Sequence, residues 1–260
     1  VPAQLIEVLR DRQLLRLDFS IFMLHAVMTA NFVALPLVLR DRAGLPVDQH
    51  GLLYLAVVAA SVVLMIPLII VAEKFRRMKP VFLLSIGLLA VAELILWLAP
   101  ADLTYVVGGL FLFFVGFNVL EATLPSLISK VAPAASKGSA LGVYSTAQFM
   151  GAFVGGVTGG LLLGWGGAES LFLLSAIAIV IWGGACLTMT PPPHLLTKMV
   201  NIGVVDEQKR QQLTAEFLQI PGVNEAVLLA QESVAYLKVD SQTLDRDRLQ
   251  SMTNKITAIS

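Results

Sequence analysis

Titratable side chains inside otherwise apolar segments are the residues of this chain best suited to chemistry. His25 lies in the apolar run 14–39, with Asp18 seven residues before it and Thr29 four after it. At this spacing the three side chains share one face of a helix. Imidazole titrates at a pH of about 6.5, so modest changes in its surroundings let it exchange protons. The pattern predicts a proton-sensitive site on a cavity wall. A neutral imidazole hydrogen-bonded between helices is the alternative.

A second polar pair lies in the apolar run 103–128, where Asn118 and Glu121 are three residues apart and share a face. A carboxyl group in low-dielectric surroundings resists ionisation, so it can bind a proton or a cationic substrate. A structural hydrogen bond is the alternative reading. Glu93 is a weaker candidate, which could pair with a neighbour or point toward the outer headgroups.

A glycine ridge marks the run 139–164. Gly151, Gly155 and Gly159 recur every four residues, a spacing that lets helix backbones approach closely. The ridge predicts static helix packing, or a smooth surface along which helices slide. Gln148 stands at its start and could hydrogen-bond a substrate or a partner helix.

The composition is that of a membrane protein. Of the 260 residues, 57% are hydrophobic and 14% charged, against roughly 45–50% and about 25% in soluble domains. This balance excludes an ordinary soluble enzyme and intrinsic disorder, and the net charge of zero does not favour nucleic acid. The single cysteine, Cys186, excludes an intramolecular disulfide. We identify no catalytic constellation, so we expect neither enzymatic activity nor a bound cofactor or metal.

The apolar residues divide the chain into a membrane region and a tail. A spanning helix needs about 20 mostly apolar residues, and six stretches meet that length: 14–39, 51–72, 80–99, 103–128, 139–164 and 168–190. The fold class expected is therefore an all-α polytopic membrane bundle of six transmembrane helices in residues 1–190. A proline-rich linker, 191–197, and a small α+β domain, 198–260, follow.

Basic residues predict the orientation of the bundle. Nine lysines and arginines fall on one side of the predicted spans and two, Arg40 and Arg42, on the other. The richer side is expected to be cytoplasmic. An even number of spans then places both termini in the cytoplasm. The nine are Arg10, Arg12, Arg16, Lys74, Arg76, Arg77, Lys79, Lys130 and Lys137.

The tail has the pattern β-α-β-β-α. Strands are expected near 199–204, 225–230 and 234–240, and Asp206 and Asp245 are suited to cap the two helices. This order matches a ferredoxin-like plait that stops before its sixth element. The tail has no CxxC loop, which disfavours soft-metal transfer, and regulation, membrane docking and dimerisation stay open.

Two local patterns recur at nearly constant offsets. Leu35-Pro36-Leu37 is expected to close the first helix and Leu124-Pro125-Ser126 the fourth, while Tyr54 and Tyr144 begin the second and fifth. Three helices followed by three helices is the signature of an inverted-topology repeat, which is typical of transporters.

The loop 72–79, AEKFRRMK, resembles a degenerate copy of the basic cytoplasmic loop of the major facilitator superfamily, with Arg76 where that loop has glycine. Residues 114–130 and 137–149 resemble the YajR-like group of proton-driven drug-efflux transporters within it. The resemblance covers the whole chain, but as the C-terminal half of a twelve-helix fold.

The resemblance implies a secondary transporter of the bacterial inner membrane that exports small molecules in exchange for protons by alternating access, together with an N-terminal six-helix half. It implies that the first and fourth helices line the cavity. His25 and Glu121 are then the proton-coupling candidates. The substrate-cavity candidates are Asn118, Gln148 and Thr29, and the cytoplasmic gate candidates are Glu73, Lys74, Arg76 and Arg77. The rival function is a membrane-anchored sensor or scaffold whose tail binds a ligand or partner.

Overall fold

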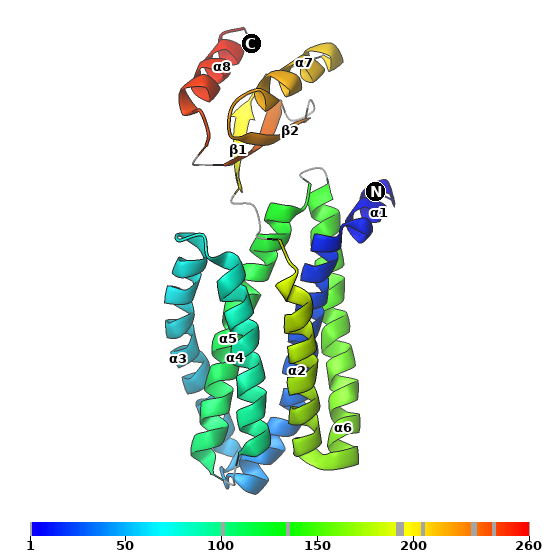
Figure 1. The fold of residues 1–260 in the computed structure, drawn as a ribbon, viewed down its shortest axis with the longest axis vertical. Coiled ribbons are helices and arrows are strands. Elements are labelled where there is room, and N and C mark those ends of the chain that lie inside the picture. Colours follow the sequence, from blue (N-terminus) through cyan, green and yellow to red (C-terminus); the bar gives the residue numbers. More distant parts are fainter. Residues whose placement is uncertain are drawn as a thin grey trace. The chain divides into compact units, whose positions relative to one another are not determined.

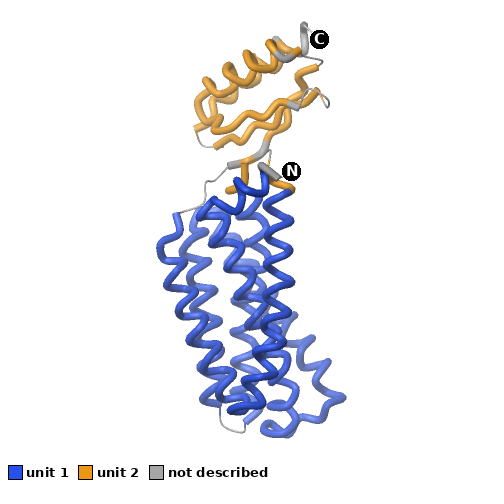
Figure 2. The backbone as a smooth tube through the Cα atoms, turned by 90° about the vertical axis from the view of Figure 1, so that its right-hand side faces the viewer, with its two compact units in different colours: residues 1–129, 139–192 blue, residues 130–138, 193–260 orange. Residues whose placement is uncertain are grey.

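The computed structural model describes residues 2–99, 102–133, 136–190, 195–203, 206–229, 233–240 and 243–259. The chain forms two compact units, which are coloured separately in Figure 2. The first comprises residues 1–129 and 139–192, and the second comprises residues 130–138 and 193–260. Each unit is described by itself below.

The first unit is a bundle of long helices (Figure 1). Its elements are α1 (Pro2–Arg10), α2 (Arg12–Leu37), the π-helical turn η1 (Val38–Arg42), α3 (Val47–Glu73), α4 (Met78–Leu98), α5 (Leu103–Val131) and α6 (Lys137–Leu187). Five of these helices are long and apolar enough to cross a membrane: α2 with η1, α3, α4, α5 and α6. The short helix α1 is not among the elements expected from the sequence.

The longest helix, α6, supplies two of the six expected spans. Its 51 residues would extend roughly 76 Å if straight, more than twice the hydrocarbon thickness of a bilayer, ~30 Å. The backbone is not helical at Gly166 and Gly167, where φ at Gly167 is +71°. Figure 1 shows the chain doubling back at this break. The two arms correspond closely to the stretches 139–164 and 168–190.

The two proline motifs act differently. Pro36 lies in the last turn of α2, as expected, whereas Pro125 lies inside α5, which continues to Val131. The expectation that Leu124-Pro125-Ser126 ends the fourth helix is therefore wrong. A proline inside a helix cannot donate to the carbonyl four residues earlier, here that of Glu121. Membrane helices tolerate this loss where neighbouring groups or local adjustments compensate.

The glycine ridge of α6 packs directly on the backbone of α2. A Cβ atom added to Gly155 would lie 2.1 Å from the carbonyl oxygen of Ala26, and one added to Gly151 would lie 2.2 Å from that of Phe22. The equivalent atom on Gly159 would lie 2.7 Å from the Cα of Ala30. This contact, the α2–α6 seam, leaves no room for side chains.

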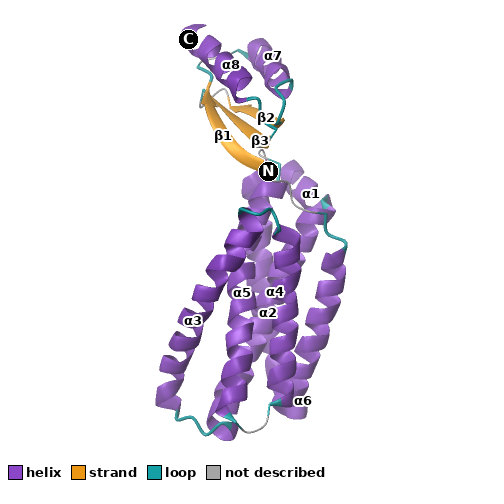
Figure 3. Ribbon diagram, turned by 60° about the vertical axis from the view of Figure 1, so that its left-hand side comes forward, coloured by secondary structure: helices purple, strands orange, loops and turns teal. Residues whose placement is uncertain are grey.

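Burial differs sharply among the spans. Half of the most apolar stretch of α2 is buried, and half of that of α5, but only 17% of that of α3. Figure 3 shows α3 at the edge of the bundle. Most of the apolar surface of α3 therefore needs lipid or another protein segment to cover it.

The second unit holds the tail, in which a three-stranded antiparallel sheet has the order β1-β3-β2. Its elements are β1 (Leu195–Asn201), α7 (Glu207–Leu218), β2 (Val223–Leu229), β3 (Val234–Asp240) and α8 (Arg246–Ile259). The β-α-β-β-α order is as the sequence predicts. β1 begins within the segment expected as linker, and the three prolines 191–193 lie outside the described residues.

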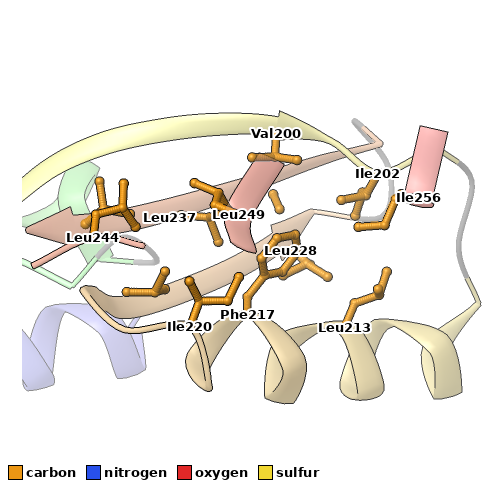
Figure 4. Packing of buried hydrophobic residues seen from close by; sticks show 13 residues of the cluster. Val200, Ile202, Leu213, Phe217, Ile220, Leu228, Leu237, Leu244, Leu249 and Ile256 are labelled. Carbon is orange, nitrogen blue, oxygen red and sulfur yellow. The ribbon is translucent and has the colours of Figure 1, made fainter. Parts of the chain in front are cut away.

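One hydrophobic cluster joins both helices to one face of the sheet (Figure 4). Phe217 of α7 and Leu237 of β3 are fully buried in it, and Leu249 and Ile256 of α8 pack into the same cluster. Both expected caps are present: Asp206 accepts from the backbone N–H of Lys209, and Asp245 accepts from that of Arg248. The tail thus has a small hydrophobic core of its own.

Candidate functional site

Three helices bring three of the predicted polar side chains together. His25 of α2, Glu121 of α5 and Gln148 of α6 form one hydrogen-bonded cluster. The Nε2 atom of Gln148 lies 2.9 Å from Nε2 of His25 and 3.2 Å from Oε1 of Glu121. The other carboxylate oxygen, Oε2, lies 3.8 Å from Nε2 of His25. We call these residues the α2–α5–α6 cluster.

The contacts of His25 define its tautomer. Its Nδ1 lies 3.3 Å from the carbonyl oxygen of Ile21, which can only accept, so Nδ1 carries the proton. The Nε2 atom is then free to accept from the amide of Gln148. With the amide of Gln148 in this orientation, the arrangement is that of a neutral imidazole. A second proton on Nε2 requires Gln148 to turn its oxygen toward the ring, or Glu121 to become the partner.

Glu121 is more exposed than His25. Its side chain is 36% exposed, against 10% for that of His25. Its Oε2 is nevertheless shielded, with no hydrogen-bond partner among the described residues. The backbone carbonyl of Glu121 has also lost its usual donor to Pro125. The carboxyl group is thus partly exposed and lies beside the imidazole.

Two further polar side chains border the cluster. Asp18 of α2 is 5% exposed, and neither of its carboxylate oxygens has a hydrogen-bond partner within the described part of the chain. The hydroxyl of Tyr144 on α6 is likewise buried and unpartnered there. Tyr144 lies within electrostatic range of both Asp18 and Glu121. The sequence placed Asp18 on the face of His25, but it marked Tyr144 only as part of a repeat.

Comparison with known proteins gives the family. Residues 17–209 match the family profile described as Major Facilitator Superfamily. The chain belongs to this superfamily. The inner membrane transport protein YajR of Escherichia coli (strain K12) is 40% identical over 240 residues, which are 92% of this chain and 52% of the relative. An uncharacterized transporter of Buchnera aphidicola subsp. Baizongia pistaciae is 23% identical over 177 residues, 68% of this chain and 45% of the relative.

A solved structure has a similar fold. The POT family transporter PepTSo, crystallised in meso, superposes with a TM-score of 0.59 at 16% identity, over 70% of this chain and 39% of that one. At this identity the likeness shows the fold alone. The chain spans about half the length of the curated relatives it matches. It is thus a membrane protein of the major facilitator superfamily, a family of transporters.

The remaining cavity candidates of this superfamily member lie outside the cluster. Asn118 donates to the hydroxyl of Ser61 on α3 at 2.8 Å, so it links α5 to α3. The methyl group of Thr29 faces Gly156, where an added Cβ atom would lie 3.5 Å away. Phe117 packs on the imidazole of His25, with ring centroids 5.8 Å apart.

No group of three His, Cys, Asp or Glu side chains in the described ranges is arranged to hold a metal.

The loop that resembles the superfamily's basic motif, residues 72–79, contains one residue with a left-handed backbone conformation. Arg76 has φ of +55°, in the left-handed region that favours glycine, and glycine is the residue that the resemblance implies at this position. Glu73, Lys74 and Arg77 are exposed. Lys79 donates to the carbonyl of Leu187 at the end of α6. Arg76 therefore adopts a backbone conformation that glycine takes more readily.

Proposed function

We propose that this chain is the C-terminal six-helix half of a secondary transporter in the bacterial inner membrane. Together with an N-terminal half, it would export small molecules in exchange for protons by alternating access. The superfamily supports membrane transport. The α2–α5–α6 cluster supports proton coupling, because two titratable groups meet there on helices that the resemblance assigns to the cavity.

The proposed topology places the basic side of the bundle, and both termini, in the cytoplasm. This follows from nine lysines and arginines against two. The tail is then a cytoplasmic domain, which we assign to the ferredoxin-like plait without its last strand. Its β1-β3-β2 order and the shared core of α7 and α8 support the assignment.

An N-terminal half would cover the apolar surfaces that this half exposes. Large apolar side chains are exposed on α3 and on the first arm of α6. Lipid is the other possible cover for them. Examples are Leu52, Leu55 and Val63 on α3, and Phe149, Phe153 and Trp165 on α6. Since these six helices supply one wall of a cavity, we expect no transport by this chain alone.

The cluster itself carries the proposal. In the neutral arrangement Gln148 donates to both His25 and Glu121 and so holds them together. A proton taken up by Glu121 from water, and passed to Nε2 of His25, would leave a cation beside a carboxylate 3.8 Å away. A cationic or strongly polar substrate group could compete for the same carboxylate. The aromatic wall at Phe117 suits the apolar part of an amphipathic molecule.

The test is Glu121→Gln in the complete transporter, reconstituted in vesicles with a pH gradient and an amphipathic fluorescent cation, ethidium, as the probe. The amide keeps the shape but cannot bind the coupling proton, so gradient-driven ethidium movement is expected to be lost. Glu216→Gln on the exposed face of α7 serves as the control and should leave movement intact. Unchanged pH-dependent movement in Glu121→Gln would remove Glu121 from the mechanism.

A further inference from the structure

A second buried acid lies in the membrane region, on a different helix from the cluster. Glu93 of α4 and Asn31 of α2 are both 0% exposed. The amide Nδ2 of Asn31 donates to Oε1 of Glu93 at 2.5 Å. Each side chain keeps one buried oxygen, Oε2 of Glu93 and Oδ1 of Asn31, without a hydrogen-bond partner among the residues described.

The two leftover atoms make a matched pair only if Glu93 carries a proton. As a carboxylate, Glu93 would leave two oxygens, its own Oε2 and Oδ1 of Asn31, with no donor between them. As a carboxylic acid, it gains an O–H that can donate to the amide oxygen. An acid and a primary amide then exchange two hydrogen bonds in one ring, and every polar atom of the pair is satisfied.

Among the described residues no cation forms an ion pair with Glu93, and Asn31 is the side chain that hydrogen-bonds it. A buried carboxylate without a cation neutralises instead of remaining ionised. The tail offers the contrast: Lys238, 6% exposed, has the carboxylate of Glu225 3.1 Å away and can stay charged.

We propose that Glu93 is a permanent proton-binding site, whose acid–amide pair with Asn31 clamps α2 to α4. Asn31 is six residues from His25, which separates the two side chains by about 120° around the helix, so they lie on different faces. The clamp thus fixes α2 on one face while a neighbouring face carries the coupling groups. Its proton stays in place during transport, which makes Glu93 and Asn31 positioning residues.

Infrared spectroscopy of the complete transporter in detergent tests the protonation directly. We expect a C=O stretching band of a protonated carboxyl group that is absent in Glu93→Gln and constant from mildly acidic to mildly alkaline pH. Absence of any band that this variant removes would show an ionised Glu93 and overturn the proposal. A band that disappears as the pH rises would overturn it too, because the proton would then exchange.

A double-mutant cycle tests the clamp. Glu93→Gln should keep the melting temperature and ethidium movement of the wild type, because an amide can also pair with Asn31. Glu93→Leu and Asn31→Leu should each lower the melting temperature by several degrees, since each leaves a buried partner unsatisfied, and the double variant should recover most of the loss. Loss of coupled movement in Glu93→Gln, or additive effects in the cycle, would contradict the clamp. The result for Glu121→Gln is independent of these readouts, so the two proposals can fail separately.

Discussion

The two faces of α2 show how one helix can hold two acids in different ways. Toward α5 and α6, His25 meets a carboxyl group that is 36% exposed and an amide that contacts both. Toward α4, Asn31 meets a carboxyl group that is 0% exposed. The first face is partly exposed and has more than one polar partner, whereas the second is fully buried with one polar partner among the described residues. In our proposals, exposure and choice of partner, more than the presence of an acid, separate a site that exchanges protons from one that keeps its proton.

The two faces of α2 also differ in how many acceptor oxygens near them lack a donor among the described residues. Near the cluster, Asp18 has two oxygens and Glu121 one that find no partner among the described residues, so several protonation states can be accommodated. At Glu93 a single proton, placed between its Oε2 and Oδ1 of Asn31, would satisfy both leftover oxygens. Variants of the polar side chains of the cluster should therefore change coupling, and variants of the acid–amide pair should change stability.

The largest effect is expected where the cluster depends on the α2–α6 seam. Gly155→Ala places a methyl group 2.1 Å from the carbonyl oxygen of Ala26, so α2 and α6 must separate. Overpacking of a well-packed contact costs about 1–3 kcal/mol, and occasionally more, when backbone must move. We expect a marked loss of monodisperse protein on size-exclusion chromatography in detergent, and a lower melting temperature.

Gly160→Ala is the matched control for this prediction. It lies on the same helix with nothing within 4 Å of the added atom. Alanine is a better helix former than glycine by about 0.5–1 kcal/mol, so stability should be kept or raised. Equal stability of the two variants would show that the α2–α6 seam does not hold together the helices that carry the cluster.

A smaller effect is expected from Gln148→Leu, which keeps the packing volume but removes the amide that bridges His25 and Glu121. Hydrogen bonds to charged groups contribute about 1.5–3 kcal/mol, and about 1.4 kcal/mol is a factor of ten in rate. Gradient-driven ethidium movement in the complete transporter should therefore fall about tenfold. Thr158→Val, which removes a hydroxyl bonded to its own helix on α6, should change nothing. If Gln148→Leu kept the rate and its pH profile, the bridge would not take part in coupling.

Hydropathy and spacing predict the bundle well, because each span is determined by its own residues. The apolar runs, the polar residues His25 and Glu121 and the capping residue Asp206 are all local signals. The close packing of Gly155 follows in the same way from its four-residue spacing. The tail pattern was equally local, since strand alternation and helix caps are read within a few residues.

Contacts between distant helices could not be predicted in this way. Nothing in the sequence pairs Asn31 with Glu93, 62 residues apart, or turns Asn118 toward Ser61. Pro125 was misjudged because proline ends helices in water, whereas in a membrane bundle the helix continues. The sequence marks Tyr144 only as part of a repeat, and its buried hydroxyl becomes meaningful only within electrostatic range of Asp18 and Glu121.

The smallest effect is expected from a hydrogen bond of α2 between two uncharged side chains. It shows how much an ordinary buried hydrogen bond adds to the melting temperature. Ser20, 1% exposed, accepts from the indole N–H of Trp182 on the second arm of α6 at 2.9 Å. Ser20→Ala leaves that buried donor unsatisfied and should cost about 1 kcal/mol, or a fall in melting temperature of roughly 2–4 °C. Ser85→Ala is the matched control, because the hydroxyl of Ser85 is equally buried but bonds the carbonyl of Val81 on its own helix. If Ser20→Ala lowered the melting temperature as much as Glu93→Leu, any buried hydrogen bond between helices would stabilise α2 equally. The acid–amide pair would then have no special role.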